Sequence, residues 1–191
     1  MVFVKFGHSH EQAEGDMQRL AFDWLNLERR RTQCNIYVPE VYKIFTRDGV
    51  TFIVMEFIEG SRVWDFAKWF EAQYWEDHKS KYYDLIVEGI QLLRRMPDDE
   101  APIEYRTVGE LQDHLNKVAK FAYHNNPHPP TVNLEKELVF CYTDFDDENF
   151  MFTTSAHGRL RLYIVDFELA SFLPIDFFAY TVLVPTSPAG S

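Results

Sequence analysis

An acidic loop set between apolar strands is the feature that most limits what this chain can fold into. The loop is Thr-Asp-Phe-Asp-Asp-Glu-Asn at 143–149, and the segment around it reads as strand, loop, strand, turn and strand. Asp144 and Asn149 lie in the loop, and Asp166 stands where the last strand ends. One carboxylate can orient a hydroxyl group, while an amide oxygen and a second carboxylate can hold Mg²⁺ against phosphates. The spacing therefore predicts a site for phosphoryl transfer.

Composition and charge exclude several classes of protein. The 191 residues suit one domain or a two-lobed unit, and the 46% hydrophobic content, with 17 Phe, predicts a sizeable core rather than disorder. The net charge of −11 argues against a nucleic-acid-binding surface, which needs clustered Lys and Arg, and against an anionic membrane as partner. An acidic chain suits a cationic substrate, although most acidic proteins are simply soluble.

The cysteines and the hydropathy pattern indicate a cytoplasmic protein. Cys34 and Cys141 give no disulfide framework, and Cys141 lies in an apolar strand where it is expected to pack as a small hydrophobe. The N-terminus lacks the apolar region of a signal peptide. No apolar run approaches the roughly 18–20 residues that span a bilayer.

The first third of the chain predicts strands and one helix. Residues 2–6 are strand-like, with Lys5 near the exit, and residues 11–28 have a helical stripe of apolar side chains. Two strands, 38–45 and 50–57, flank the hairpin turn Arg47-Asp48-Gly49. The break at Glu59-Gly60-Ser61 is the predicted boundary between two lobes.

Helices dominate the sequence between this boundary and the acidic loop. The patterns predict helices at 63–75, at 82–95 and at 107–124, the last with Val108, Leu111, Leu115, Val118, Ala119 and Ala122 facing inward. Residues 184–191 have little packing potential and are predicted to be disordered. The fold class is therefore α+β.

The order of these features resembles a known family. A strand with Lys5, a helix with acidic residues, a hairpin that runs into Met-Glu-Phe-Ile-Glu-Gly, Asp144-x-x-x-x-Asn149 and Ile164-Val165-Asp166 follow one another. This order resembles the aminoglycoside phosphotransferase and choline kinase branch of the protein-kinase-like fold, in particular its uncharacterised fungal group. The resemblance implies a two-lobe fold, with a reduced N-terminal β lobe at 1–58 and a mainly helical C-terminal lobe at 59–183.

The resemblance also implies how ATP is bound. Lys5 would contact the α- and β-phosphates and pair with a carboxylate of the following helix, for which Glu14 is preferred and Glu11 is the alternative. The hinge between the lobes would offer backbone groups to the adenine. Its residues are Glu56, Phe57 and Ile58.

Catalysis would follow the same resemblance. Asp144 would be the catalytic Asp and would accept the proton of a small-molecule hydroxyl, while Asn149 and Asp166 would bind Mg²⁺. Residues 170–174 resemble the segment that follows the metal-binding Asp in this group. The implied reaction moves the γ-phosphoryl group of ATP to that hydroxyl, and the sequence does not name the acceptor.

Two departures from the family pattern define an alternative. The family usually has a His two residues before the catalytic Asp, and here that position is Tyr142. The chain starts at the Lys5 strand, so the strands and loop that cover the phosphates would lie upstream, as in an N-terminally truncated member. The alternative is an inactive, kinase-like binding or scaffold protein, or a truncated remnant.

Three other interpretations are weaker. His8 and His10 have an alternating spacing that can bind a metal, but no third ligand is spaced nearby for Zn. The aromatic residues of 64–75 could form a cage for a cation such as choline, although a packed amphipathic helix explains them more simply. A protein kinase proper is disfavoured, because Tyr-Thr-Asp replaces His-Arg-Asp and Asp-Phe-Glu replaces Asp-Phe-Gly.

Overall fold

The N-terminal sheet is built around the hairpin that the turn residues predict. β3 (Val41–Arg47) and β4 (Val50–Glu56) pair antiparallel, and the turn takes positive φ at Asp48 (52°) and Gly49 (76°). These are the backbone angles that Asp-Gly turns tolerate. β1 (Val2–Gly7) pairs antiparallel with the other edge of β4 and places Lys5 opposite Ile53. The strand order is β1-β4-β3.

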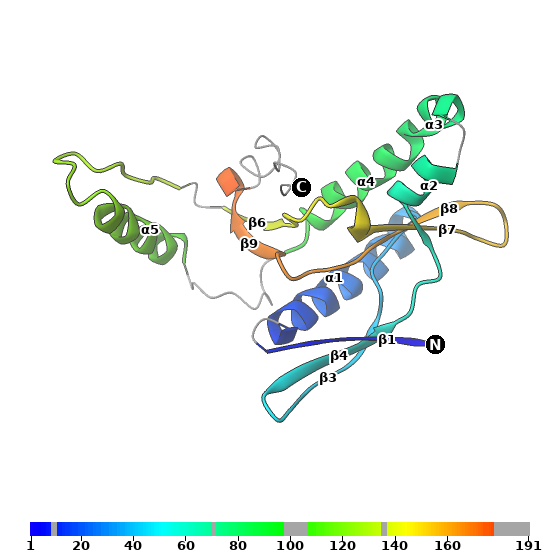
Figure 1. The fold of residues 1–191 in the computed structure, drawn as a ribbon, viewed down its shortest axis with the longest axis horizontal. Coiled ribbons are helices and arrows are strands. Elements are labelled where there is room, and N and C mark those ends of the chain that lie inside the picture. The colour runs from blue at the N-terminus through cyan, green and yellow to red at the C-terminus, as the bar shows by residue number, and fades with distance from the viewer. Residues whose placement is uncertain (9–10, 70–71, 98–106, 135–136, 178–191) are drawn as a thin grey trace.

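The helix α1 (Glu11–Thr32) packs against this sheet (Figure 1). It continues four residues beyond the predicted end at residue 28, through the three consecutive arginines. The contact is close at Gly15, where an added Cβ would lie 2.5 Å from Ile44 Cδ1. The absence of a side chain at Gly15 therefore lets the first turns of α1 approach the sheet, and this brings Glu14 next to β1.

A second sheet and a strand pair make up the remaining β structure. The second sheet has the order β2-β8-β7-β5, with β2 parallel to β8 and the other pairs antiparallel. β6 pairs antiparallel with β9. The bounds are β2 (Ile36–Tyr37), β5 (Ser61–Arg62), β6 (Leu138–Cys141), β7 (Phe150–Thr154), β8 (Leu160–Ile164) and β9 (Ser171–Pro174).

Helices of the second half agree with the sequence patterns to different degrees. The predicted stripe of α4 is buried at Tyr82, Ile86, Gly89, Ile90 and Leu93. The helical structure predicted at 63–75 is present in α2 and α3, and residues 70–71 between them lie outside the described residues. The bounds are α2 (Val63–Trp69), α3 (Ala72–His78), α4 (Ser80–Leu93), α5 (Val108–Ala122) and the 3₁₀ turn η1 (Asp147–Asn149).

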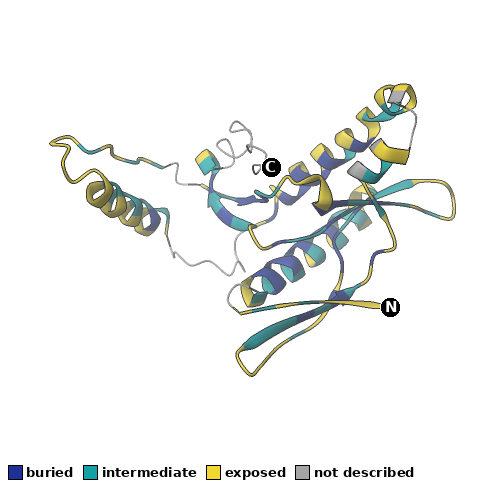
Figure 2. Cartoon of the chain, in the orientation of Figure 1, coloured by how far each residue is buried: buried dark blue, intermediate teal, exposed yellow. Residues whose placement is uncertain are grey.

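One main core joins elements from both halves of the chain. It combines Met17, Ala21 and Leu25 of α1 with the buried faces of α4, β7 and β8 (Figure 2). A smaller cluster of Val41, Ile53 and Met55 lies under the N-terminal sheet. The structure is therefore mixed α+β, and the division into lobes at 58/59 stays a prediction.

α5 lies apart from the main body, together with the loop that follows it (Figure 1). Leu111 is its buried residue, whereas Val118 is 51% exposed, so the prediction of a fully inward apolar stripe was wrong. The side chain of Asn116 in α5 binds the backbone of Val132 in the following loop. Its Nδ2 donates to the Val132 carbonyl at 3.0 Å, and its Oδ1 accepts from the Val132 N–H at 2.7 Å.

This computed structural model describes residues 1–8, 11–69, 72–97, 107–134 and 137–177. The predicted disordered tail at 184–191 lies outside these ranges, as does His10. Among the described helices, none combines the length and the apolar content that crossing a membrane requires.

Candidate functional site

A cleft of about 780 Å³ gathers most of the residues that the sequence singles out. β1, α1 and β4 line it on one side, and η1, β7 and the end of β8 line it on the other. Residues 57–60 connect the two sides. The predicted nucleotide and metal residues that line the cleft are Lys5, Glu14, Glu56, Phe57, Ile58, Asn149 and Asp166.

Lys5 stands between three carboxylates. Its Nζ lies 2.9 Å from Glu14 Oε2 and 3.0 Å from Asp166 Oδ1, which is 161 positions away in the sequence. Glu168 Oε2 is 3.6 Å from the same nitrogen. Glu11, the alternative partner, has its carboxylate against Gly7 instead, so the structure pairs Lys5 with Glu14.

Burial and pairing set the charge of the Lys5–Glu14 pair. Burial raises the pKa of Glu14, whose side chain is 2% exposed, and the ammonium of Lys5 limits that rise. Burial works to lower the pKa of Lys5, but its hydrogen bonds and attraction to Glu14 and Asp166 outweigh this, and its pKa is raised. Lys5 is therefore a permanent cation at neutral pH.

The raised pKa of Glu14 predicts a pH dependence of stability. Between the unfolded value of about 4.5 and the higher folded value, the folded state binds more protons than the unfolded state. The contribution of Glu14 is therefore fully present below pH 4.5 and declines as the pH rises through the folded pKa. Gln does not titrate, so the unfolding free energy of a Glu14→Gln protein lacks this decline. The unfolding free energy of the variant minus that of the parent should therefore increase as the pH rises through this window.

Urea unfolding at half-unit pH steps from 4 to 7 measures this difference. Asp16→Asn is the matched control, because Asp16 lies on the same helix and is more exposed. A Glu14→Gln difference that stays flat, or that falls as the pH rises, would contradict the assignment.

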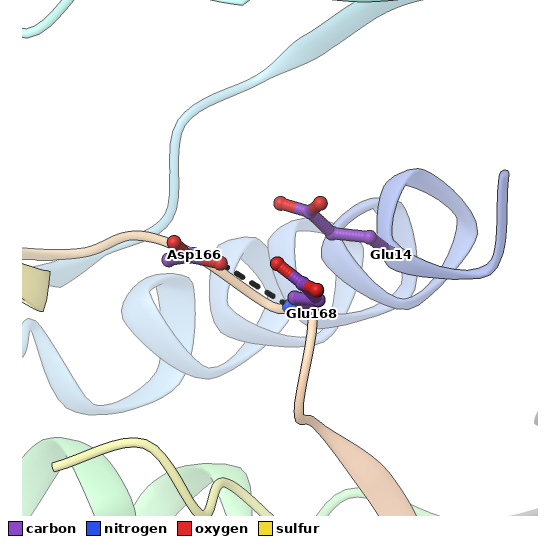
Figure 3. Close-up of side chains that lie close together, drawn as sticks. All are labelled: Glu14, Asp166 and Glu168. Atoms are coloured by element: carbon purple, nitrogen blue, oxygen red, sulfur yellow. Dashed lines mark hydrogen bonds between the residues drawn. The ribbon is translucent and has the colours of Figure 1, made fainter. Parts of the chain in front are cut away.

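Asp166 has an unusual backbone conformation. Its φ is +62°, in the left-handed region that costs most residues energy and that Asp tolerates better than most. Its Oδ1 accepts from Lys5 Nζ. It also accepts, at 3.4 Å, from the backbone N–H of Glu168 (Figure 3). The side chains of Glu14, Asp166 and Glu168 point toward one another in this view. Strain of this kind is common where a side chain must point at a ligand.

Asn149 is held by the 3₁₀ turn η1. The side chain of Asp146 accepts from the Glu148 N–H and caps this turn, and Asn149 itself is buried. Asn149 Nδ2 donates to the carbonyl oxygen of Asp144 at 3.3 Å, which leaves its amide oxygen as the atom available to a cation. Val165 N–H donates to the Asn149 carbonyl at 3.0 Å, so the turn is tied directly to the residue before Asp166.

Asp144 is placed differently from the other predicted residues. It is partly buried, two residues after Tyr142, and does not line the cleft. Its negative charge contributes to raising the pKa of the Tyr142 hydroxyl.

The donors around Asp166 fit Mg²⁺. Single carboxylate oxygens of Glu14, Asp166 and Glu168 lie within 4.8 Å of one another, and Mg²⁺ prefers carboxylate and amide oxygens. The Lys5 ammonium already serves as counter-ion to this group. Glu14 and Asp166 both accept from Lys5, and Asn149 lines the same cleft, so Asn149 and Asp166 stay the predicted residues that would hold Mg²⁺.

Sequence reasoning missed several residues of the site. Glu168 could have been predicted, because it stands two residues after Asp166 at the same strand end. Arg62 carried no sequence signal. It lines the cleft from β5 and pairs with Glu148 at 3.0 Å.

Of the charged residues that line the cleft, Lys5 and Arg62 face six carboxylates: Glu14, Glu56, Glu59, Asp65, Glu148 and Asp166.

The aromatic residues proposed as a cation cage do not form one set. Phe66 and Trp75 pack on the core beside Tyr82, with ring centroids 4.9 and 5.6 Å from its ring. Trp69 is exposed, and Tyr74 stacks on His78. Phe70 and the side chain of Trp64 lie outside what the structure describes. For the described members, packing explains the pattern.

Comparison with known proteins agrees with this architecture. No protein-family model matches the chain, and no curated protein matches it. Among solved structures, the GDP complex of a point mutant of aminoglycoside 2′-phosphotransferase-IIIa aligns with a TM-score of 0.55 at 17% identity, over 95% of this chain and 64% of the other. The fold is kinase-like. The comparison therefore confirms the fold class predicted from the sequence, which is α+β and kinase-like.

A second solved structure has a weaker likeness to this kinase-like chain. It is described as a putative fructosamine-3-kinase from Haemophilus somnus 129PT, and it aligns with a TM-score of 0.43 at 17% identity, over 98% of this chain and 65% of the other. The chain thus spans just under two thirds of the length of each of these two proteins.

Proposed function

We propose that the chain binds a nucleoside triphosphate, ATP in the first instance, with Mg²⁺ and transfers its γ-phosphoryl group to the hydroxyl of a small molecule. One observation carries the proposal. Lys5, paired with the buried Glu14, meets Asp166 and Asn149 in a single cleft, although these residues come from opposite ends of the chain. A kinase-like fold with this set of groups supports phosphoryl transfer.

Each residue has a defined part in this reaction. Lys5 binds and neutralises phosphate oxygens, and the backbone of residues 56–58 holds the base. Mg²⁺, when bound by Asn149 and Asp166, offsets the negative charge of the phosphates. The bond between the γ-phosphorus and its bridging oxygen breaks, a bond to the acceptor oxygen forms, and Asp144 takes the acceptor's proton.

The charge of the cleft implies that nucleotide binding depends strongly on the metal. Six carboxylates line the cleft against two cations, and Lys5 is already shared among three carboxylates. A polyphosphate that entered without a cation would meet net repulsion. We therefore expect ATP to bind weakly without Mg²⁺ and much more tightly with it.

A thermal-shift titration with ATP, with and without Mg²⁺, tests this proposal. A ligand at 100 times its dissociation constant stabilises by about 2.7 kcal/mol, which raises the Tm of a chain of this size by roughly 5–10 °C. The rise should require Mg²⁺ and should disappear in an Asp166→Asn protein. Arg62→Gln serves as a control for general charge changes in the cleft. A parent protein with no Mg²⁺-dependent rise would contradict the proposal.

A second candidate function is nucleotide binding without turnover. The observation that favours it is the position of Asp144, which does not line the cleft that holds the other predicted residues. Such a protein would pass the thermal-shift test and would not consume ATP. The substitution of Asp144 described in the Discussion separates the two functions.

A further inference from the structure

Tyr142 contacts both parts of the chain that carry the proposed metal ligands. Its ring is buried and packs against Phe150 beside the acidic loop and against Phe167 beside Asp166, with centroid separations of 6.0 and 5.5 Å. Its hydroxyl donates to the carbonyl oxygen of Val165 at 2.5 Å. The two aromatic neighbours and this hydrogen bond hold the side chain of Tyr142 in place.

The hydrogen bond from Tyr142 lies within a short network. The Val165 carbonyl belongs to the peptide that leads into Asp166, the residue with positive φ. The Val165 N–H is bound to the Asn149 carbonyl at 3.0 Å. Val165 thus accepts a hydrogen bond from Tyr142 and donates another to Asn149, and these two bonds link the backbone of Asn149 to the residue before Asp166.

The surroundings of the Tyr142 hydroxyl favour its protonated form, which can donate a hydrogen bond. Burial raises its pKa far above the usual value, and the nearby carboxylates of Asp144, Asp166 and Glu14 add to the rise, while a side-chain hydrogen bond with Asn149 opposes it. A phenolate could not donate to the carbonyl of Val165.

We propose that Tyr142 is a positioning residue: its hydroxyl holds the Val165–Asp166 peptide, and through it the spacing of Asp166 from Asn149, in the geometry that binds Mg²⁺. This inference rests on the proposed function for its metal, whereas the backbone geometry stands without it. It gives a physical role to the residue that departs from the family pattern. Tyr142 does not line the cleft, and it acts through the backbone of Val165 and through its contact with the side chain of Asn149.

The first test uses the nucleotide-free protein. Amide hydrogen exchange at Val165 and Asp166 is compared in the parent, in Tyr142→Phe and in Tyr82→Phe. Tyr82 is the control, since it is also a buried tyrosine of the main core and lies against Phe66 and Phe152. Exchange at 165–166 should rise about three- to tenfold in Tyr142→Phe alone, the change expected for one lost hydrogen bond. Unchanged exchange there would overturn the inference.

The second test uses the metal. At fixed ATP, the Mg²⁺ concentration at half-maximal binding should rise about three- to tenfold in Tyr142→Phe, while the weak metal-free binding of ATP stays the same. Tyr142→His, which keeps an N–H donor, should recover part of the loss, and Tyr82→Phe should change nothing. An equal loss of binding with and without Mg²⁺ would overturn the positioning role. A parent without any Mg²⁺-dependent binding would instead overturn the proposed function and leave the exchange result to decide the backbone role.

Discussion

Asp144→Asn is expected to reduce ATP turnover by about 10²–10⁴-fold while leaving Mg²⁺–ATP binding within a factor of about two. The size of the loss follows from removing a general base that accepts the proton of the acceptor hydroxyl. Binding should persist because Asp144 lies outside the cleft that Lys5, Asn149 and Asp166 line. Asn149 bonds to the backbone carbonyl of Asp144 and not to its carboxylate, so the substitution should not move the neighbouring ligand.

Turnover is measured as ADP release, with water as acceptor and then with a mixture of small hydroxyl compounds. Asp146→Asn is the matched control, because Asp146 lies in the same loop and an Asn side chain can still cap η1. The control should keep the parent rate. Equal rates for the parent and Asp144→Asn would exclude Asp144 as the base. A parent that binds Mg²⁺–ATP and releases no ADP would establish the non-catalytic alternative.

The local features of the site could be predicted because each depends on a few neighbouring residues. The Asp48–Gly49 turn fixes the hairpin, and the hairpin fixes the edge where β1 pairs. The acidic run after an apolar strand predicts a polar loop at a strand end. These local rules place Asp144 and Asn149 in one loop, and Asp166 at the end of a later strand.

The features that the sequence did not reveal depend on contacts between distant segments. The parallel pairing of Ile36–Tyr37 with β8 brings α1 into the main core, and two residues are too short to give a strand signal. The stripe of α5 predicted burial, but a helical period does not say whether a partner surface is present. Glu168 became part of the site only because Lys5 reaches across from β1.

Lys5→Met is expected to lower the free energy of unfolding by about 2–4 kcal/mol. The substitution leaves the carboxylate of Glu14, only 2% exposed, without the ammonium that neutralises it. Removing one partner of a buried ion pair costs about 3–5 kcal/mol, and the 26% exposure of Lys5 reduces that figure. Nucleotide binding should be lost as well, because the ammonium of Lys5 is the group proposed to bind the phosphates.

A double-mutant cycle separates the two effects of Lys5. Adding Glu14→Gln should restore most of the stability, because it removes the uncompensated charge, and should restore no nucleotide binding. The exposed pair of Arg62 and Glu148, with a similar separation of 3.0 Å and side-chain exposures of 45% and 65%, provides the matched control. Arg62→Met should cost about 0–1 kcal/mol. If Lys5→Met lowered the free energy of unfolding no more than Arg62→Met does, the burial of Glu14 would not explain the contribution of the Lys5–Glu14 pair to stability. If Glu14→Gln restored nucleotide binding along with stability, Lys5 would be a structural counter-ion and not a ligand of the phosphates.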